Sequence, residues 1–144
     1  SLKGKIMSIY DNVVNTSVGL ELMKGKTFVR VEGAVGSGEM LFVTENGERF
    51  LFTHIQDCCE SVDINDIVGD IQDLVGAPLL IAEAVDGEVP ADFEDEYTES
   101  YTYTFYKFAT IKGYVDVRWL GESNGYYSES VDLCVSDNVA KELA

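Results

Sequence analysis

Alternating apolar and polar residues predict β-strands along much of this chain. Residues 27–32 are rich in Phe and Val, which favour strands. Residues 40–44 and 48–53 are two further apolar, aromatic and β-branched runs on either side of Asn46-Gly47. Asn-Gly is a strong hairpin signal, because both central residues of the tight turn adopt positive φ. The sequence therefore predicts a hairpin centred on Asn46-Gly47.

Residues 63–75 carry the clearest helical pattern. Their apolar residues follow the spacing of a single helix face, namely Ile64, Ile67, Val68, Ile71, Leu74 and Val75. Asp63 is a favourable N-cap, and Gly76 suits the left-handed position after a helix. Pro78 cannot continue a helix. We therefore expect one amphipathic helix in this segment.

The C-terminal half predicts further strands. Residues 79–85 are a short apolar run, expected to be a buried strand, and residues 101–108 are dense in Thr and aromatic residues. Residues 114–120 alternate as a half-buried strand does. The chain is then expected to turn at residues 121–125 and to return as a strand within residues 127–135.

The remaining segments complete an α+β fold class. Residues 1–26 leave helix and strand open, and residues 86–100 are acidic and predict an exposed loop. Ser136 is the expected N-cap of a short helix that ends at Leu143. The expected architecture is a mainly antiparallel β-sheet of hairpins and a meander, with one amphipathic helix packed on it. Residues 1–144 are interpreted as a single domain.

Charge is the most informative bulk property. The chain has 26 acidic and 10 basic residues, a net charge of −16. No Lys or Arg lies between Arg49 and Lys107, a stretch with 14 acids. Such a chain repels phosphate backbones, which argues against nucleic acids and anionic membranes as partners. Basic proteins and divalent cations remain open as partners, and acidity that only maintains solubility is the alternative interpretation.

Hydropathy and cysteine content indicate a cytoplasmic protein. No apolar run approaches the roughly 20 residues of a membrane helix, and no basic segment precedes an apolar stretch as in a secretory signal. The three cysteines are Cys58, Cys59 and Cys134. Adjacent cysteines do not normally bridge each other, so the sequence predicts no disulfide framework. A reducing compartment is the matching expectation.

The first candidate site is the segment of residues 54–61, which contains His54, the one histidine. A metal site would use His54, Asp57, a cysteine and Cys134. Zinc ligands, however, come as pairs at fixed spacing, and adjacent strand residues point to opposite sides. Cysteine catalysis needs positive charge near the thiolate, and this segment is negative. The remaining interpretation is a buried cysteine with a histidine bonded to backbone. An enzyme is disfavoured and no cofactor is expected.

The second candidate site is the segment of residues 118–130. It gathers the residue types that recognition surfaces use, namely Arg118, Trp119, Glu122, Asn124, Tyr126 and Tyr127. The same composition fits an ordinary hairpin in which Trp119 belongs to the core and Asn124-Gly125 forms the turn. Both interpretations stay open at this point.

Two signatures in this chain resemble a family. They are the run Gln56-Asp57-Cys58-Cys59-Glu60-Ser61-Val62 and the run from Trp119 to Glu129, with residues 103–107 between them. The chain is similar to a domain-of-unknown-function family of small proteins from bacteriophage and prophage genomes, over roughly residues 40–133. The resemblance implies a phage or prophage protein that acts in the bacterial cytoplasm. It implies no activity.

We expect the two candidate segments to converge into one surface or pocket. Its residues would be His54, Asp57, Glu60, Arg118, Trp119, Glu122, Asn124, Tyr126 and Tyr127. The expected function is a non-enzymatic protein that binds a host macromolecule, as an acidic inhibitor of a basic surface. The alternative is a small-molecule or metal-ion binding domain whose pocket the two segments form. A homo-oligomer is left open.

Overall fold

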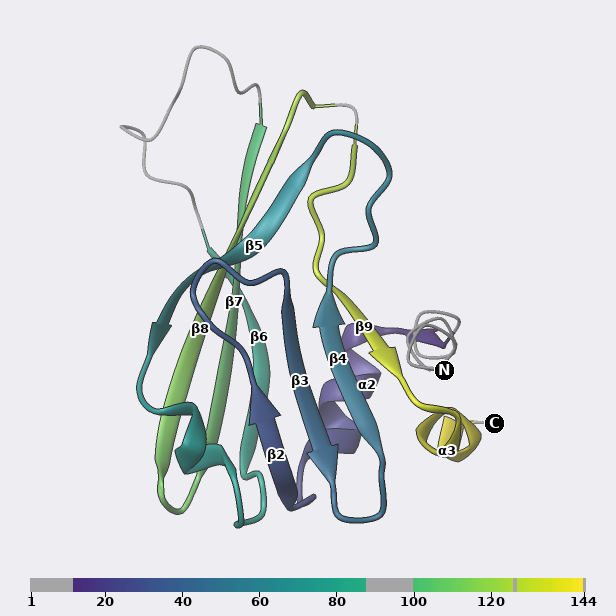
Figure 1. Cartoon of the computed structure of the whole chain (residues 1–144), viewed down its shortest axis with the longest axis vertical. Coiled ribbons are helices and arrows are strands. Elements are labelled where there is room, and N and C mark those ends of the chain that lie inside the picture. The colour runs from purple at the N-terminus through teal and green to yellow at the C-terminus, as the bar shows by residue number, and fades with distance from the viewer. Residues whose placement is uncertain (1–11, 88–99, 126, 144) are drawn as a thin grey trace.

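Two antiparallel sheets face each other and enclose the core (Figure 1). The computed structural model describes residues 12–87, 100–125 and 127–143. The first sheet has five strands, in the order β1 (Val13–Val14), β9 (Asp132–Val135), β4 (Arg49–Thr53), β3 (Glu39–Thr44) and β2 (Phe28–Glu32). The second has four strands, in the order β5 (Ser61–Val68), β8 (Gly113–Ser123), β7 (Ser100–Thr110) and β6 (Ile81–Gly87).

Every strand pair in these two sheets is antiparallel, so the predicted mainly antiparallel architecture is confirmed. The predicted hairpin is β3–β4. Val43 pairs with Arg49 across the turn, and Gly47 has a φ of 83°. Asn46 does not share this positive φ, so the hairpin is confirmed but the turn with positive φ at both central residues is not. A side chain at Gly47 would strain this backbone, because positive φ brings Cβ close to the neighbouring carbonyl.

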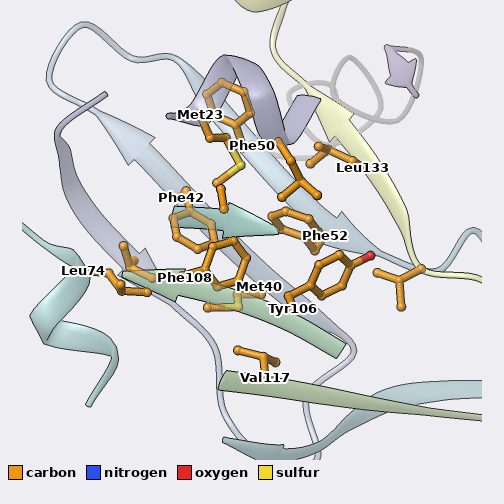
Figure 2. Close-up of a cluster of buried hydrophobic side chains, with 14 of the residues drawn as sticks. Met23, Met40, Phe42, Phe50, Phe52, Leu74, Tyr106, Phe108, Val117 and Leu133 are labelled. Carbon is orange, nitrogen blue, oxygen red and sulfur yellow. The ribbon is translucent and has the colours of Figure 1, made fainter. Parts of the chain in front are cut away.

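Aromatic side chains fill the space between the sheets (Figure 2). The ring centroids of Phe42 and Phe108 are 5.0 Å apart, and those of Phe52 and Tyr106 are 4.9 Å apart. Phe42 and Phe52 come from the first sheet, and Tyr106 and Phe108 from the second. Large aromatic faces dominate the burial of apolar area, so these contacts join the two sheets into one core.

The prediction of a helix at residues 63–75 is wrong. The segment continues β5 to Val68 and then forms a short 3-10 turn, η1 (Ile71–Leu74). Ile64 pairs with Trp119 and Ile67 pairs with Val117, with a bulge between Ile64 and Asp66. A bulge inserts one extra residue into a strand. Two inward positions therefore lie three residues apart, which imitates the helical spacing.

The amphipathic helix lies instead in the segment that the pattern left undecided. Helix α2 (Thr16–Met23) starts at Asn15, whose side chain accepts a hydrogen bond from the Val18 N–H at 3.2 Å. Leu20 and Met23 are buried in the core. The helix contacts β6, an edge strand of the second sheet, and β9, the strand next to the edge strand β1 in the first sheet, so it connects the two sheets at one side of the domain.

The short apolar run at residues 79–85 is an edge strand, not a buried one. Of β6, only Ala82 is buried among the side chains described, while Ile81 and Val85 are about two-fifths exposed. The run is buried at its start, where Leu79 is 0% exposed in the core, and partly exposed along the strand. The acidic loop was predicted at residues 86–100, but residues 86 and 87 belong to β6 and residue 100 begins β7 (Ser100–Thr110). The rest of the predicted loop, residues 88–99, lies outside the described residues.

The predicted return strand pairs in the other sheet. Strand β8 runs on to Ser123, and the chain then crosses to form β9, which pairs Leu133 with Phe52 of β4. The C-terminus forms α3 (Asp137–Ala140) and the 3-10 turn η3 (Lys141–Leu143). Ser136 makes no side-chain cap there. Its hydroxyl accepts a hydrogen bond from the Arg49 N–H at 2.9 Å.

Among the described residues, no helix has the length and apolar character needed to cross a bilayer.

Candidate functional site

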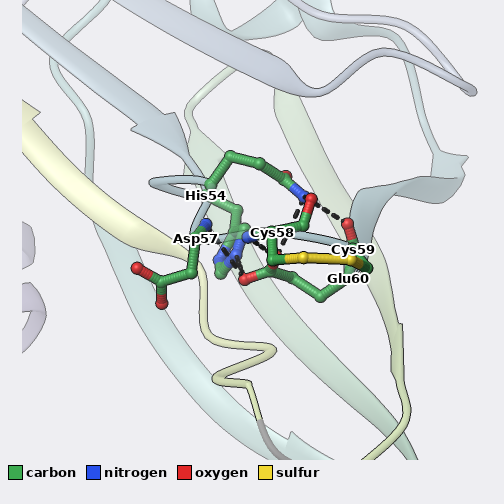
Figure 3. Close-up of a disulfide and its surroundings, with 6 residues drawn as sticks. His54, Asp57, Cys58, Cys59 and Glu60 are labelled. Atoms are coloured by element: carbon green, nitrogen blue, oxygen red, sulfur yellow. Dashed lines mark hydrogen bonds and ion pairs between the residues drawn. A yellow bond between two sulfur atoms is a disulfide. The ribbon is translucent and has the colours of Figure 1, made fainter.

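The loop between β4 and β5 closes around the carboxylate of Glu60 (Figure 3). The backbone N–H groups of Cys58 and Asp57 donate to this carboxylate at 2.8 and 3.2 Å. The Gln56 side-chain amide donates to Glu60 Oε1 at 3.0 Å and to the Cys58 carbonyl at 3.2 Å. Glu60 is 4% exposed. The signature at residues 56–60 thus supplies a buried acid together with the donors that satisfy it.

His54 connects this loop to the chain beyond β8. Its Nε2 lies 2.9 Å from Glu60 Oε2, and its Nδ1 lies 2.6 Å from the Ser130 carbonyl oxygen. A carbonyl and a carboxylate only accept hydrogen bonds. Both ring nitrogens are therefore satisfied when His54 is the doubly protonated imidazolium and Glu60 is ionised. The histidine was expected to bond to backbone, and it does, but it also holds a buried ion pair.

The pKa values of the two partners move apart. Burial by itself would raise the pKa of Glu60, but the N–H of Cys58, the His54 ring and further backbone donors lower it to about 2. Burial by itself would lower the pKa of His54, but Glu60, the Ser130 carbonyl and Asp132 together raise it. Both shifts favour the charged pair.

The pair is expected to stabilise the fold most between about pH 4.5 and 6.5, the ordinary pKa values of the two groups. Its contribution fades as pH falls through the lowered pKa of Glu60, and as pH rises through the raised pKa of His54. Urea unfolding of wild type and Glu60→Gln should therefore differ most in this window. The difference should shrink on both sides.

Asp57→Asn is the control for this pH dependence, because it removes an exposed carboxylate from the same loop. Its free energy of unfolding should follow the wild-type curve. A Glu60→Gln difference that stays constant from about pH 5 to 9 would contradict a charged pair.

The structure corrects the predicted recognition role of Trp119. The indole is 0% exposed and packs in the core, where Trp119 pairs with Ile64 and Thr104 of the neighbouring strands. Its inward direction follows from strand alternation, since Val115 and Val117 of β8 are also 0% exposed. Of the two interpretations left open, the core interpretation holds.

The other described residues predicted in the segment of residues 118–130 are at least partly exposed. Arg118 lies on the outward face of β8, where its Nε donates to Asn65 Oδ1 at 2.7 Å and its guanidinium lies 5.0 Å from the Tyr103 ring centroid. Asn124 is exposed and Tyr127 is 36% exposed. Tyr126 lies outside the described residues.

The two segments nevertheless meet, through buried and backbone groups. Ser61 pairs with Glu122 across β5 and β8, and His54 reaches the Ser130 carbonyl. Between them Glu129 crosses over Gly121, where an added Cβ would lie 2.6 Å from Glu129 Cβ. The expected convergence is thus a structural junction rather than an open pocket.

Sequence reasoning missed Glu129, a second buried acid. Its Oε2 accepts hydrogen bonds from the hydroxyls of Ser100 and Thr102 at 2.9 and 2.8 Å. The spacing Trp119-x-Gly121 was the available signal. A glycine between inward-facing strand residues often marks the close approach of another backbone.

The remaining chemistry considered in the sequence concerns the three cysteines. The sulfurs of Cys58 and Cys59 form a disulfide, so the prediction that these neighbours stay unbridged is wrong. They lie in a loop rather than in a strand, which lets both side chains point the same way (Figure 3). Cys134 is buried on β9, away from this loop. The described residues contain no group of three or more His, Cys, Asp or Glu side chains arranged to hold a metal ion.

Residues 21–133 match a domain of unknown function, DUF7448. The chain belongs to this family. The match includes both signatures and extends further toward the N-terminus than the resemblance at residues 40–133. Neither a curated protein nor a solved structure matches the chain. The DUF7448 assignment therefore carries no activity, and chemistry must be read from the surface of the domain itself.

The outward face of the second sheet is the surface of this DUF7448 domain where chemically varied side chains gather. Exposed apolar residues lie beside acids there, with Tyr114 at 72% and Val68 at 56% exposed. A hollow of about 330 Å³ opens on this face, and its lining includes Asp66, Phe105, Asp116 and Arg118. Its lining contains no residue of the loop at residues 54–60.

Proposed function

We propose that this DUF7448 domain is a non-enzymatic binding protein that docks on a basic surface of a host protein through the outward face of the second sheet. The observation that carries this proposal is the distribution of charge over that sheet. The stretch that lacks Lys and Arg supplies both edge strands, β5 and β6, on either side of β7 and β8. Acids therefore flank the face on both sides.

The face is net acidic although its central strands contain cations. The strand register gives the residues on the outward face. Five of them are acids and two are cations, namely Asp63, Asp66, Glu83, Asp116 and Glu122, and Lys107 and Arg118. The Arg118 side chain is already engaged by Asn65 and Tyr103. Exposed apolar groups among charges are typical of interfaces, and the charges steer the partner and set specificity.

A non-catalytic role is supported by the state of His54. Both of its ring nitrogens are occupied by Glu60 and by the Ser130 carbonyl. General-base catalysis needs a nitrogen within reach of a substrate proton. We place the domain in a phage or prophage protein that acts in the bacterial cytoplasm, and its charge disfavours nucleic acid as the partner.

A second candidate function is small-molecule binding in the hollow of the same face. Aromatic, cationic and acidic groups converge there, as in many ligand sites. A ligand in this hollow would contact Arg118 and Phe105, not the His54 loop. In this alternative the ligand site lies on the outward face of the second sheet, and not in the pocket that the sequence placed between the His54–Glu60 and Arg118–Tyr127 segments.

The binding proposal is tested with the double variant Asp66→Asn with Asp116→Asn. Tagged domain first captures a partner from bacterial lysate, and the purified partner is then titrated against wild type and variant. We expect the variant to bind about tenfold more weakly at low salt, because two attractive charges are lost. Wild-type affinity should itself fall steeply as salt is added.

Glu32→Gln with Glu45→Gln is the matched control, with the same charge change on exposed residues of the first sheet and its hairpin. It should bind within about twofold of wild type. Equal loss in both double variants, or affinity independent of salt, would refute docking through this face. Absence of any captured protein, with a thermal shift on adding a small molecule, would favour the alternative.

A further inference from the structure

The structure assigns a second site to this domain: we infer that Cys58–Cys59 is a thiol–disulfide exchange site, through which an external thiol changes the packing between the His54 loop and the segment after β8. The bond lies on an exposed loop, with both cysteines accessible to solvent (Figure 3). Exchange requires that a thiolate reach one of the two sulfurs. This site is separate from the outward sheet face and does not depend on the proposed binding function.

The third cysteine is excluded from this chemistry. Cys134 is 0% exposed, and burial, with a contribution from Asp132, raises the pKa of its thiol to about 11. A buried, protonated thiol is a poor nucleophile. Cys134 therefore provides an internal reference within the same chain.

The disulfide lies within the contacts that hold the loop together. The Cys58 N–H donates to Glu60 Oε1 at 2.8 Å, and the Cys58 carbonyl accepts from the Gln56 amide at 3.2 Å. The covalent ring formed by the two cysteines restricts the backbone that carries both groups. Opening the ring frees that backbone, so the Cys58 donor is held less firmly against Glu60.

The effect passes from Glu60 to a distant part of the sequence. Glu60 orients His54, and His54 holds the Ser130 carbonyl, 76 residues away along the chain. Ser130 directly follows Glu129, which packs over Gly121 of β8. A change at Cys58 thus reaches the segment after β8 through three consecutive hydrogen bonds, from Cys58 to Glu60, from Glu60 to His54 and from His54 to Ser130.

The exchange balances with two external thiols. One thiolate attacks a sulfur of the Cys58–Cys59 bond, forms a mixed disulfide and releases the other cysteine as a thiolate. A second external thiolate then attacks the mixed disulfide and releases the second cysteine. The two cysteines gain two electrons and take up two protons, while the two external thiols are oxidised to one disulfide. The reverse reaction uses the same external disulfide as oxidant.

The exchange is tested on the full chain with glutathione. The protein is equilibrated over a range of reduced-to-oxidised glutathione ratios, trapped with an alkylating reagent and weighed by mass spectrometry. We expect a single transition from no label to two labels on the peptide that contains Cys58 and Cys59, with Cys134 unlabelled until the protein is denatured. Two labels at every ratio, or none even in excess thiol, would refute the site.

The coupling is tested by NMR titration of His54, which is the one histidine and so gives one ring signal. In the oxidised protein its pKa should lie above the ordinary value, and in the reduced protein it should fall toward that value. Cys58→Ser should match the reduced protein in either buffer, with Cys59→Ser as the second variant if the first does not fold. Cys134→Ser should still respond to the redox buffer. Identical titration curves in both redox states would refute the coupling.

Discussion

Replacing Trp119 with alanine is expected to lower the free energy of unfolding by about 3–5 kcal/mol, as removal of a large buried aromatic does. The indole is 0% exposed and lies between the two sheets, so its loss leaves a cavity. Folded domains are typically stable by about 5–15 kcal/mol, and the variant should lose a large share of that margin. Urea denaturation followed by circular dichroism measures the effect.

Tyr114→Ala is the control, because Tyr114 is on the same strand but is 72% exposed. It should change stability by about 0.5 kcal/mol or less. The comparison separates the two roles considered for Trp119. A Trp119→Ala protein as stable as wild type would contradict the core assignment and return this residue to a surface role.

Gly121→Ala is expected to destabilise the domain by about 1–3 kcal/mol, the usual cost of inserting a methyl group into a packed site. The new Cβ would lie 2.6 Å from Glu129 Cβ and 2.8 Å from the Glu129 carbonyl oxygen. A backbone that crosses this closely cannot yield by a side-chain rotation alone. The segment at residues 127–131 must therefore move outward. Urea unfolding of the variant, followed by circular dichroism, gives the loss of stability.

Gly38→Ala provides the matched glycine control. Within the described part of the chain, and apart from its two chain neighbours, the heavy atom within 4 Å of its added Cβ is the Asp63 Oδ1 at 3.3 Å, the end of a flexible side chain. Its stability should change by about 0.5 kcal/mol or less. If Gly121→Ala is equally mild, then Glu129 does not lie over β8 as described.

Three residues of the second signature explain why a family signature need not mark a binding site. Trp119 fills the core, Gly121 admits the crossing chain, and Glu129 is buried against Ser100 and Thr102. The polar and aromatic composition of this segment suggested a recognition surface. In the structure these side chains instead pack between the strands and help to join the two sheets. The surface proposed for binding is assembled instead from the outward positions of β5, β6, β7 and β8.

Local patterns located most strands of this DUF7448 domain but not their partners. The hairpin at Asn46-Gly47 could be predicted because two residues and their flanks decide it. The bulge after Ile64 could not be predicted, because it depends on the register against β8. That single inserted residue turned the period of a strand into an apparent helix.

Part of the candidate site could also be predicted from local sequence, and part could not. That Glu60 and His54 belong to one site was predicted from the segment at residues 54–61, since Glu60 follows His54 by six positions in a polar loop. That Ser130 completes the arrangement depends on a crossing between sheets, which no local pattern records. The disulfide likewise depends on the loop conformation, because a strand would point Cys58 and Cys59 to opposite sides.

By itself, the sequence determined the acidity of the chain, its antiparallel strands and the tight turn at Asn46-Gly47, because these depend on composition and on neighbours within a few residues. Only the tertiary structure decided that Trp119 faces inward, that Glu129 crosses Gly121 and that the acidic stretch forms both edges of one sheet. The physical reason is that inward direction and strand order come from long-range pairing and from burial of apolar area shared by two sheets, which no short window of residues contains.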